Sequence, residues 1–169
     1  MAMAEYGILI EYEEVPLKVL FIENKEIQDE LQKVKHLSEE YRKEQGKNPT
    51  YHLHTFGCQM NDHDSERIAG VLESMGYEET PDEKDASVIL LNTCAIRENA
   101  EQKVFGFLGR LKHLKAKGTL IGVCGCMAQQ EHIRKKIRQS FPQVDMVFGT
   151  HNYAKLPLYL IKALEGEKS

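Results

Sequence analysis

The sequence lacks any apolar stretch long enough to cross a membrane. Its longest apolar runs, such as Val88–Leu91 and Leu158–Ile161, are far shorter than the roughly 20 residues that a spanning helix needs. Residues 1–14 are acidic, whereas an export signal begins with basic residues, and their apolar part is short. We therefore expect no membrane partner and no export, and we assign the protein to the cytoplasm.

The sequence also lacks an excess of positive charge. The chain has 22 Lys and Arg against 26 Asp and Glu, so its net charge is −4. DNA-binding domains concentrate basic residues until the isoelectric point exceeds about 9, so no DNA partner is expected. Residues 1–49 hold eleven acids and seven bases, which accounts for the whole −4, while residues 50–169 are balanced. This change predicts two regions, an N-terminal extension over 1–48 and a domain over 49–166.

Several sequence signatures are missing. There is no internal repeat and no low-complexity tract, which excludes a solenoid. There is no Gly-rich phosphate loop of the G-x-G-x-x-G or Walker type, so nucleotide hydrolysis has no support. With 169 residues, of which 41% are hydrophobic, the chain has the length and composition of one ordinary globular domain with an appendage.

Strand and helix patterns alternate after a turn at Gly46–Pro49. Residues 24–46 repeat apolar side chains every three or four positions, which predicts an amphipathic helix. Two later stretches, 87–92 and 119–124, are continuously apolar, as in parallel strands that are buried on both faces. The predicted strands are 51–56, 77–80, 87–92, 119–124 and 144–148, and the predicted helices are 62–75, 96–117, 127–140 and 155–164.

This alternation predicts an α/β fold. The expected architecture is a doubly wound, flavodoxin-like, mostly parallel five-stranded sheet with helices on both faces and an N-terminal helical extension. The expected strand order is 2-1-3-4-5. In such a sheet, ligands bind at the edge formed by the carboxyl ends of the strands.

Cysteine is scarce, but its placement is regular. The chain has four cysteines, too few for a disulfide scaffold. Cys58, Cys94 and Cys126 each follow a predicted strand and precede a predicted helix. If strands one, three and four are adjacent, at about 4.8 Å spacing, the three sulfurs converge on one site. The helix N-termini would favour their thiolates, and converging thiolates indicate a metal site.

The ligand set favours iron over zinc. Structural zinc sites usually contain a C-x-x-C knuckle, which is absent. Three widely separated thiolates can hold a 4Fe-4S cluster and leave one iron without a protein ligand, open to chemistry. Cys124 falls inside an apolar strand and is predicted to pack in the core.

Two alternatives stay open at this point. A structural zinc module that docks a partner could use the cysteines together with His54 or His63. A thiol redox domain could use the Cys124-Gly-Cys126 pair, which would form a reversible disulfide. A third interpretation is that each cysteine is simply a small apolar residue packed in the core, with no function of its own.

Three ordered motifs resemble a known family. They are Thr55-Phe-Gly-Cys-Gln-Met-Asn61, Asn92-Thr-Cys-Ala-Ile-Arg-Glu98 and Gly125-Cys-Met-Ala-Gln129. Together they resemble the N-terminal domain of the radical S-adenosylmethionine methylthiotransferases, and more closely the branch that modifies tRNA. The resemblance covers roughly residues 50–165.

The resemblance implies a role for each motif cysteine. Cys58, Cys94 and Cys126 match the three ligands of an auxiliary 4Fe-4S cluster, whose open iron is thought to carry the sulfur or methylthio group. Members of the tRNA branch add a methylthio group to C2 of N6-isopentenyladenosine 37. This implies two partners, tRNA and the radical domain of the same polypeptide.

The family also has parts that are missing from these residues. S-adenosylmethionine and a second 4Fe-4S cluster belong to a C-x-x-x-C-x-x-C run in the next domain, and a C-terminal domain helps to bind tRNA. The present residues alone are therefore expected to hold a cluster but to be inactive.

Other polar residues near the motifs have two readings each. Asn61 and Asn92 could donate hydrogen bonds to sulfur or cap helices. Arg97 and Glu98 could line the site or be solvated charge. The basic residues of two helices could contact tRNA phosphates, although a solvated face is the simpler reading. They are Arg110, Lys112, Lys115 and Lys117 on one helix, and Arg134, Lys135, Lys136 and Arg138 on the other.

Overall fold

The computed structural model describes residues 25–57, 59–94 and 99–169, which form an α/β domain. Its five strands form one sheet in the order β2-β1-β3-β4-β5, with every neighbouring pair parallel, so the predicted order is confirmed. The strands are β1 (Thr50–Thr55), β2 (Glu78–Glu79), β3 (Val88–Thr93), β4 (Leu120–Gly125) and β5 (Met146–Phe148). The α-helices are α3 (Lys25–Gln45), α4 (Gln59–Ser74), α5 (Ala100–Leu111), α6 (Glu131–Ser140) and α7 (Leu156–Leu164).

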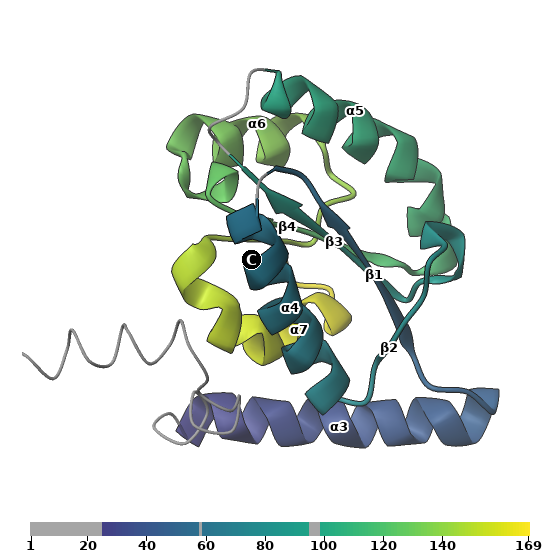
Figure 1. Ribbon diagram of the computed structural model, residues 1–169. Coiled ribbons are helices and arrows are strands. Elements are labelled where there is room, and N and C mark those ends of the chain that lie inside the picture. Colours follow the sequence, from purple (N-terminus) through teal and green to yellow (C-terminus); the bar gives the residue numbers. More distant parts are fainter. Residues whose placement is uncertain (1–24, 58, 95–98) are drawn as a thin grey trace, which may run out of the picture.

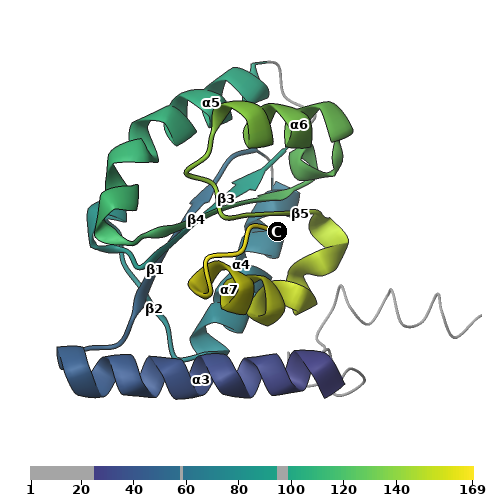
Figure 2. The ribbon, with the colours of Figure 1, turned by 180° about the vertical axis from the view of Figure 1, so that it is seen from behind.

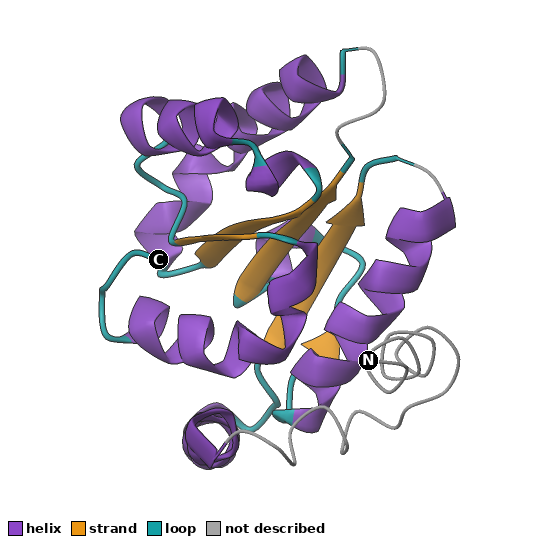
Figure 3. Ribbon diagram, turned by 90° about the vertical axis from the view of Figure 1, so that its left-hand side faces the viewer, coloured by secondary structure: helices purple, strands orange, loops and turns teal. Residues whose placement is uncertain are grey.

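Helices cover both faces of the sheet, as predicted. Figure 1 shows α5 and α6 on one face and α4 and α7 on the other, and the same three layers are seen from the side in Figure 3. The central strands are buried on both faces because their apolar side chains alternate between two cores. In β3, Val88 and Leu90 pack with α4 and α7, whereas Ile89 and Leu91 pack with α5 and α6. No helix in the described part of the chain is both long and apolar enough to span a membrane.

The N-terminal helix α3 packs against the domain. Its buried residues Ile27, Leu31, Val34 and Ser38 recur every three or four positions, as predicted for an amphipathic helix. The three apolar ones belong to the same core as α4 and α7. Figure 2 shows α3 lying across the base of the molecule, below α7. The helix is therefore integrated into the core, and the boundary placed after residue 48 stays a prediction.

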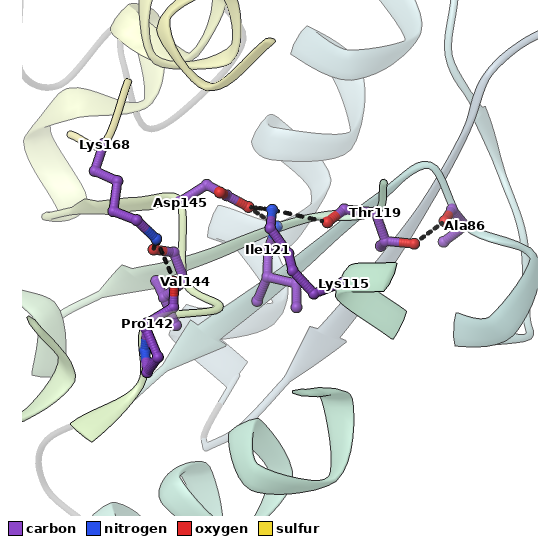
Figure 4. A network of polar contacts seen from close by, with 8 residues as sticks. All are labelled: Ala86, Lys115, Thr119, Ile121, Pro142, Val144, Asp145 and Lys168. Carbon is purple, nitrogen blue, oxygen red and sulfur yellow. Dashed lines mark hydrogen bonds and ion pairs between the residues drawn. The ribbon is translucent and has the colours of Figure 1, made fainter. Parts of the chain in front are cut away.

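A network of polar contacts ties the β4–β5 edge together (Figure 4). The Asp145 carboxylate accepts a hydrogen bond from the Ile121 amide at 2.9 Å. It also forms an ion pair with Lys115. Beside it, Lys168 donates to the carbonyl of Val144 at 3.0 Å. The backbone of Ser169 pairs with β5: its amide donates to the backbone carbonyl of Asp145, and its carbonyl accepts from the amide of Val147.

Several predicted boundaries were wrong. The helix expected over 96–117 is not continuous: Asn99 has a left-handed backbone with φ 63°, α5 begins at Ala100, and Lys112–Lys117 form the 3-10 helix η2. The helix expected from 127 is a 3-10 turn, η3 (Met127–Gln129), and the extended backbone of Gln130 separates it from α6. Strands β2 and β5 are shorter than predicted.

Candidate metal centre

The three strands that precede the motif cysteines are adjacent and end at one edge. In the pairing of β1 with β3, Thr55 lies opposite Asn92, and in the pairing of β3 with β4, the last partners are Thr93 and Gly125. Cys94 and Cys126 are the residues that come directly after this last pair. The sheet therefore places these two predicted ligands at neighbouring positions of its carboxyl edge.

Gly57 brings the end of β1 onto Cys94. Its φ is 124°, a conformation that L side chains rarely adopt, and a Cβ built on it would lie 2.5 Å from the Cβ of Cys94. Only a residue without a side chain fits this close approach. Cys58 lies outside the described residues, and the sequence joins it directly to Gly57. The backbone that leads into Cys58 therefore runs beside Cys94.

Gly125 brings the end of β4 onto the other side of the same strand end. Its φ is 99°, and a Cβ built on it would overlap the carbonyl oxygen of Thr93 and lie 2.8 Å from Oδ1 of Asn92. Gly57 and Gly125 thus lie against the end of β3, where Cys94 is. We call this arrangement, made of Gly57, Cys94, Gly125 and Cys126, the glycine cradle.

The side chains of Asn61 and Asn92 support the glycine cradle through hydrogen bonds. The Asn92 side chain donates to the carbonyl of Asn61 at 2.8 Å and to Oγ of Ser65 at 2.9 Å. In return, the Asn61 side chain donates to the carbonyl of Thr93 at 3.1 Å. Both asparagines are buried, and their bonds connect α4 to the end of β3. The sequence offered two roles for Asn92, a hydrogen bond to sulfur and helix capping. The contacts of its side chain match neither role, and instead hold the end of β3 in place.

The cysteines differ sharply in their environment. Cys94 is only 2% exposed, and Cys126, at the start of η3, is half-buried. Cys124 is fully buried in the core beside α4 and α7, which confirms its prediction as a core residue. Burial, with a smaller contribution from the Asp64 carboxylate, raises the pKa of the Cys124 thiol. A thiol that keeps its proton is a poor nucleophile, which disfavours the redox pair of Cys124 and Cys126.

The helix termini contribute less than expected. The prediction placed Cys94 and Cys126 at the mouths of α-helices, but α5 begins at Ala100 and α6 at Glu131. The dipole effect falls off within a helix's first turn, and neither α5 nor α6 begins at the cysteine that precedes it. The position of Cys94 instead depends on the close approach of Gly57 and on the bond from Asn61 to Thr93.

The histidines of the zinc alternative are engaged elsewhere. The His54 ring packs 4.4 Å from the Phe56 ring and 4.5 Å from the Phe107 ring, between centroids. Burial lowers the pKa of His54. His63 is exposed and pairs with Glu66 at 3.5 Å. These contacts disfavour a site made of three cysteines and a histidine.

The donor set fits an iron-sulfur cluster. Soft thiolates are the protein ligands of such clusters, and the sheet brings two cysteines, Cys94 and Cys126, to one edge. Within the residues described here, no group of three or more His, Cys, Asp or Glu side chains is arranged to hold a metal ion. The third predicted ligand, Cys58, is outside those residues, as are Arg97 and Glu98.

Several of the basic helix residues make contacts within the domain itself. Lys115 is paired with Asp145 and donates to the carbonyl of Thr119 at 3.1 Å. Arg110 lies over the Phe107 ring at 4.4 Å from its centroid. On α6, the exposed Lys135 pairs with Glu131, as on an ordinary solvated helix face.

Two residues near the cradle were missed by the sequence reasoning. Asp64 of α4 contributes to the raised pKa of Cys124. Burial chiefly raises the pKa of Tyr153 in the 3-10 helix η4 (Thr150–Lys155), and Cys124, Asp64 (also through a side-chain hydrogen bond) and Cys126 raise it further. Asp64 follows the first motif and could have been suspected from its nearness to Cys58. Tyr153 lies beyond β5, far from every motif, and only the packing of η4 against α4 reveals it.

Comparison with known proteins gives one family and many relatives. A family described as "Uncharacterized protein family UPF0004" matches residues 50–149. The tRNA-2-methylthio-N(6)-dimethylallyladenosine synthase of Bacillus cytotoxicus is 58% identical over 128 residues, which are 75% of this chain and 25% of that protein. The synthases of the same name from Staphylococcus epidermidis and Caldicellulosiruptor saccharolyticus are 54% and 47% identical, over 76% and 82% of this chain and 26% and 30% of theirs. The chain thus spans about a quarter of the length of these curated relatives.

Proposed function

Because the chain belongs to the UPF0004 family, we propose that it is the cluster-binding domain of a tRNA methylthiotransferase. In this proposal Cys58, Cys94 and Cys126 hold a 4Fe-4S cluster. One observation carries it: Gly57 and Gly125, each followed by a cysteine, close on the end of β3 where Cys94 lies. The relatives named as tRNA-2-methylthio-N(6)-dimethylallyladenosine synthases support the reaction.

Each residue of the cradle has a task in this proposal. Cys94 is buried and anchors the ligand set, while Cys126 is half-buried and therefore partly open to solvent. Asn61 and Asn92 keep the strand end rigid, so that the thiolates hold their spacing. When bound, the cluster supplies an iron without a protein ligand, at which sulfur can bind. Cys124 stays in the core and takes no part.

The reaction itself requires the whole protein. The proposed product is tRNA with a methylthio group at C2 of N6-isopentenyladenosine 37, which implies a cytoplasmic enzyme. S-adenosylmethionine and a second 4Fe-4S cluster belong to a further domain of the same polypeptide, as does part of the tRNA contact. In the whole protein, Cys94→Ala is expected to abolish the methylthio nucleoside in tRNA, measured by mass spectrometry, and Cys124→Ala to preserve it.

Anaerobic reconstitution with iron and sulfide tests the ligand set. Wild type is expected to bind about four iron and four sulfide per chain and to absorb broadly at about 400 nm. Cys58→Ala, Cys94→Ala and Cys126→Ala should each lose iron. Cys124→Ala is the matched control and should keep it. If the three variants bind as much iron as wild type does, the assignment is wrong.

Elemental analysis separates the proposal from a zinc module. Protein purified in air and protein purified without oxygen are compared for zinc and iron. A zinc site survives air, so about one zinc per chain in both preparations would overturn the cluster. Iron that is present only in the anaerobic preparation supports it.

A further inference from the structure

Aromatic side chains of β1 and α5 gather on the face of the sheet that α5 covers. His54 and Phe56, two positions apart at the end of β1, lie on the same face. The His54 ring is 4.4 Å from the Phe56 ring and 4.5 Å from the Phe107 ring of α5, between centroids. The guanidinium carbon of Arg110 lies 4.4 Å from the centre of the Phe107 ring. We call these four residues, His54, Phe56, Phe107 and Arg110, the aromatic patch.

The aromatic patch is open to solvent. Its three rings are each only partly buried, and the side chain of Arg110 is 60% exposed. The strand β1 lies next to the edge of the sheet, where the short β2 pairs with only two of its residues. One exposed ring is ordinary on a protein surface, whereas three rings and a guanidinium in contact with one another form a surface suited to binding.

The chemistry of the patch suits a nucleobase. Unpaired bases stack on aromatic rings and on the plane of an arginine guanidinium. Lys103 and Arg110 are exposed and lie four residues before and three residues after Phe107, so all three share one side of α5. Cations that flank a stacking ring can contact the phosphates on either side of the base.

Stacking also supplies what the charge of the domain lacks. Residues 50–169 carry as many acids as bases, so charge alone does not bind RNA. Arg110 pairs with Glu83 at 3.4 Å, but ion pairs with so exposed a side chain are weak, and a phosphate can take the place of the carboxylate. The patch therefore keeps its cation available to a ligand.

The patch leads toward the metal centre. Phe56 is followed by Gly57, whose backbone approaches Cys94, and then by Cys58 in the sequence. An RNA strand that stacks on the patch is therefore held beside the cysteine edge of the sheet.

We propose that the aromatic patch stacks an unpaired base of the tRNA loop that carries the target adenosine. The base lies on the outer side of the Arg110 guanidinium, which Phe107 supports from behind. The inference rests on the proposed function, because it takes tRNA as the substrate. Phe107 and Arg110 are thus binding residues that determine the affinity for RNA, and they take no part in the chemical step.

The test compares Phe107→Leu with Phe105→Leu in the whole polypeptide. Phe105 is also a partly buried ring of α5, but it stacks on Phe141 at 5.3 Å between centroids, outside the patch. Binding of an RNA stem-loop with the sequence of the tRNA loop is measured by fluorescence anisotropy, without metal. Phe107→Leu should weaken binding by about tenfold, as for the loss of one stacked base, and Phe105→Leu by less than about twofold.

Arg110→Lys separates stacking from charge. Lysine keeps the positive charge but has no plane, so this variant should lose about as much affinity as Phe107→Leu does. A fluorescent adenine analogue in the loop should be quenched on binding to wild type and less quenched on binding to Arg110→Lys. If Arg110→Lys binds as wild type does while Arg110→Ala is weaker, the contact is to phosphate alone and the inference is overturned.

Two further outcomes would also count against the patch. Another domain could cover it; in that case Phe107→Leu would destabilise the whole polypeptide far more than Phe105→Leu does in urea, and RNA affinity would not change. If wild type binds no RNA stem-loop, the proposed function fails together with the inference. If wild type binds RNA and the Phe107 and Phe105 variants bind it equally well, the inference alone is wrong.

Discussion

The Cβ position of Gly57 lies 2.5 Å from the Cβ of Cys94, closer than two side-chain carbons can approach. Gly57→Ala should therefore lower the free energy of unfolding by about 2–4 kcal/mol, because it adds both a clash and strain at φ 124°. It should also reduce iron retention after reconstitution. Urea unfolding and iron analysis measure the two effects.

The control for this change is Gly106→Ala. Gly106 lies inside α5, and a Cβ there meets nothing within 4 Å. Alanine should stabilise that helix by about 0.5–1 kcal/mol. Equal unfolding free energies for the two variants would show that the approach of Gly57 to Cys94 carries no cost.

Leucine-to-alanine changes on α3 test its integration into the core. Leu31 is 9% exposed and packs in the core beside α4 and α7, whereas Leu37 on the same helix is 41% exposed. Leu31→Ala should lower the free energy of unfolding by about 2–4 kcal/mol. Leu37→Ala should change it by less than about 1 kcal/mol. If Leu31→Ala proves as mild as Leu37→Ala, α3 is not part of the cooperative unit.

The buried Tyr77 predicts a loss of stability at alkaline pH. Burial, with a smaller contribution from Tyr41, raises the pKa of Tyr77 to about 12, while in the unfolded chain a tyrosine ionises at about 10. The unfolded state therefore releases a proton that the folded state keeps. The stabilisation is complete below pH 10 and is lost as the pH rises from about 10 toward 12.

Tyr77→Phe should flatten this part of the stability curve. For each such group, the folding equilibrium constant falls by up to about tenfold per pH unit, and the variant lacks one group. Denaturation midpoints measured between pH 9 and pH 12 would show the difference. Parallel curves for the two proteins would contradict the prediction.

Asp145 should be far more sensitive to alanine than to asparagine. Its carboxylate accepts from the Ile121 amide and pairs with Lys115. Asp145→Ala leaves the buried Ile121 amide without its acceptor and removes the ion-pair partner of Lys115, so it should lower the free energy of unfolding by about 1–3 kcal/mol. Asp145→Asn keeps an oxygen that can accept from Ile121, so thermal unfolding should place it between alanine and wild type. The reverse order would show that the hydrogen bond to Ile121 contributes little.

The sheet could be predicted from the sequence because its signals are local. Continuous apolar runs such as 87–92 require burial on both faces, and the parallel order then follows from the alternation of strands and helices. Helix boundaries were less accurate. Nothing in the sequence shows that Asn99 adopts a left-handed backbone or that Gln130 is extended, because tertiary contacts set these torsions.

The placement of two predicted ligands at one edge of the sheet could be predicted from the sequence, but the contacts that support them could not. The three motifs point to Cys58, Cys94 and Cys126, and the structure brings Cys94 and Cys126 to neighbouring strand ends. That Gly57 touches Cys94 depends on the register of β1 with β3, which a single sequence does not reveal.

The glycine cradle is held by close packing and by hydrogen bonds. Gly57 and Gly125 leave no room for a side chain beside the end of β3, and the bonds of Asn61 and Asn92 tie that strand end to α4. The separation of Cys94 from Cys126 is therefore set by residues that carry no sulfur. A substitution at any one of these four supports should move the two cysteines relative to each other while leaving both in the sequence.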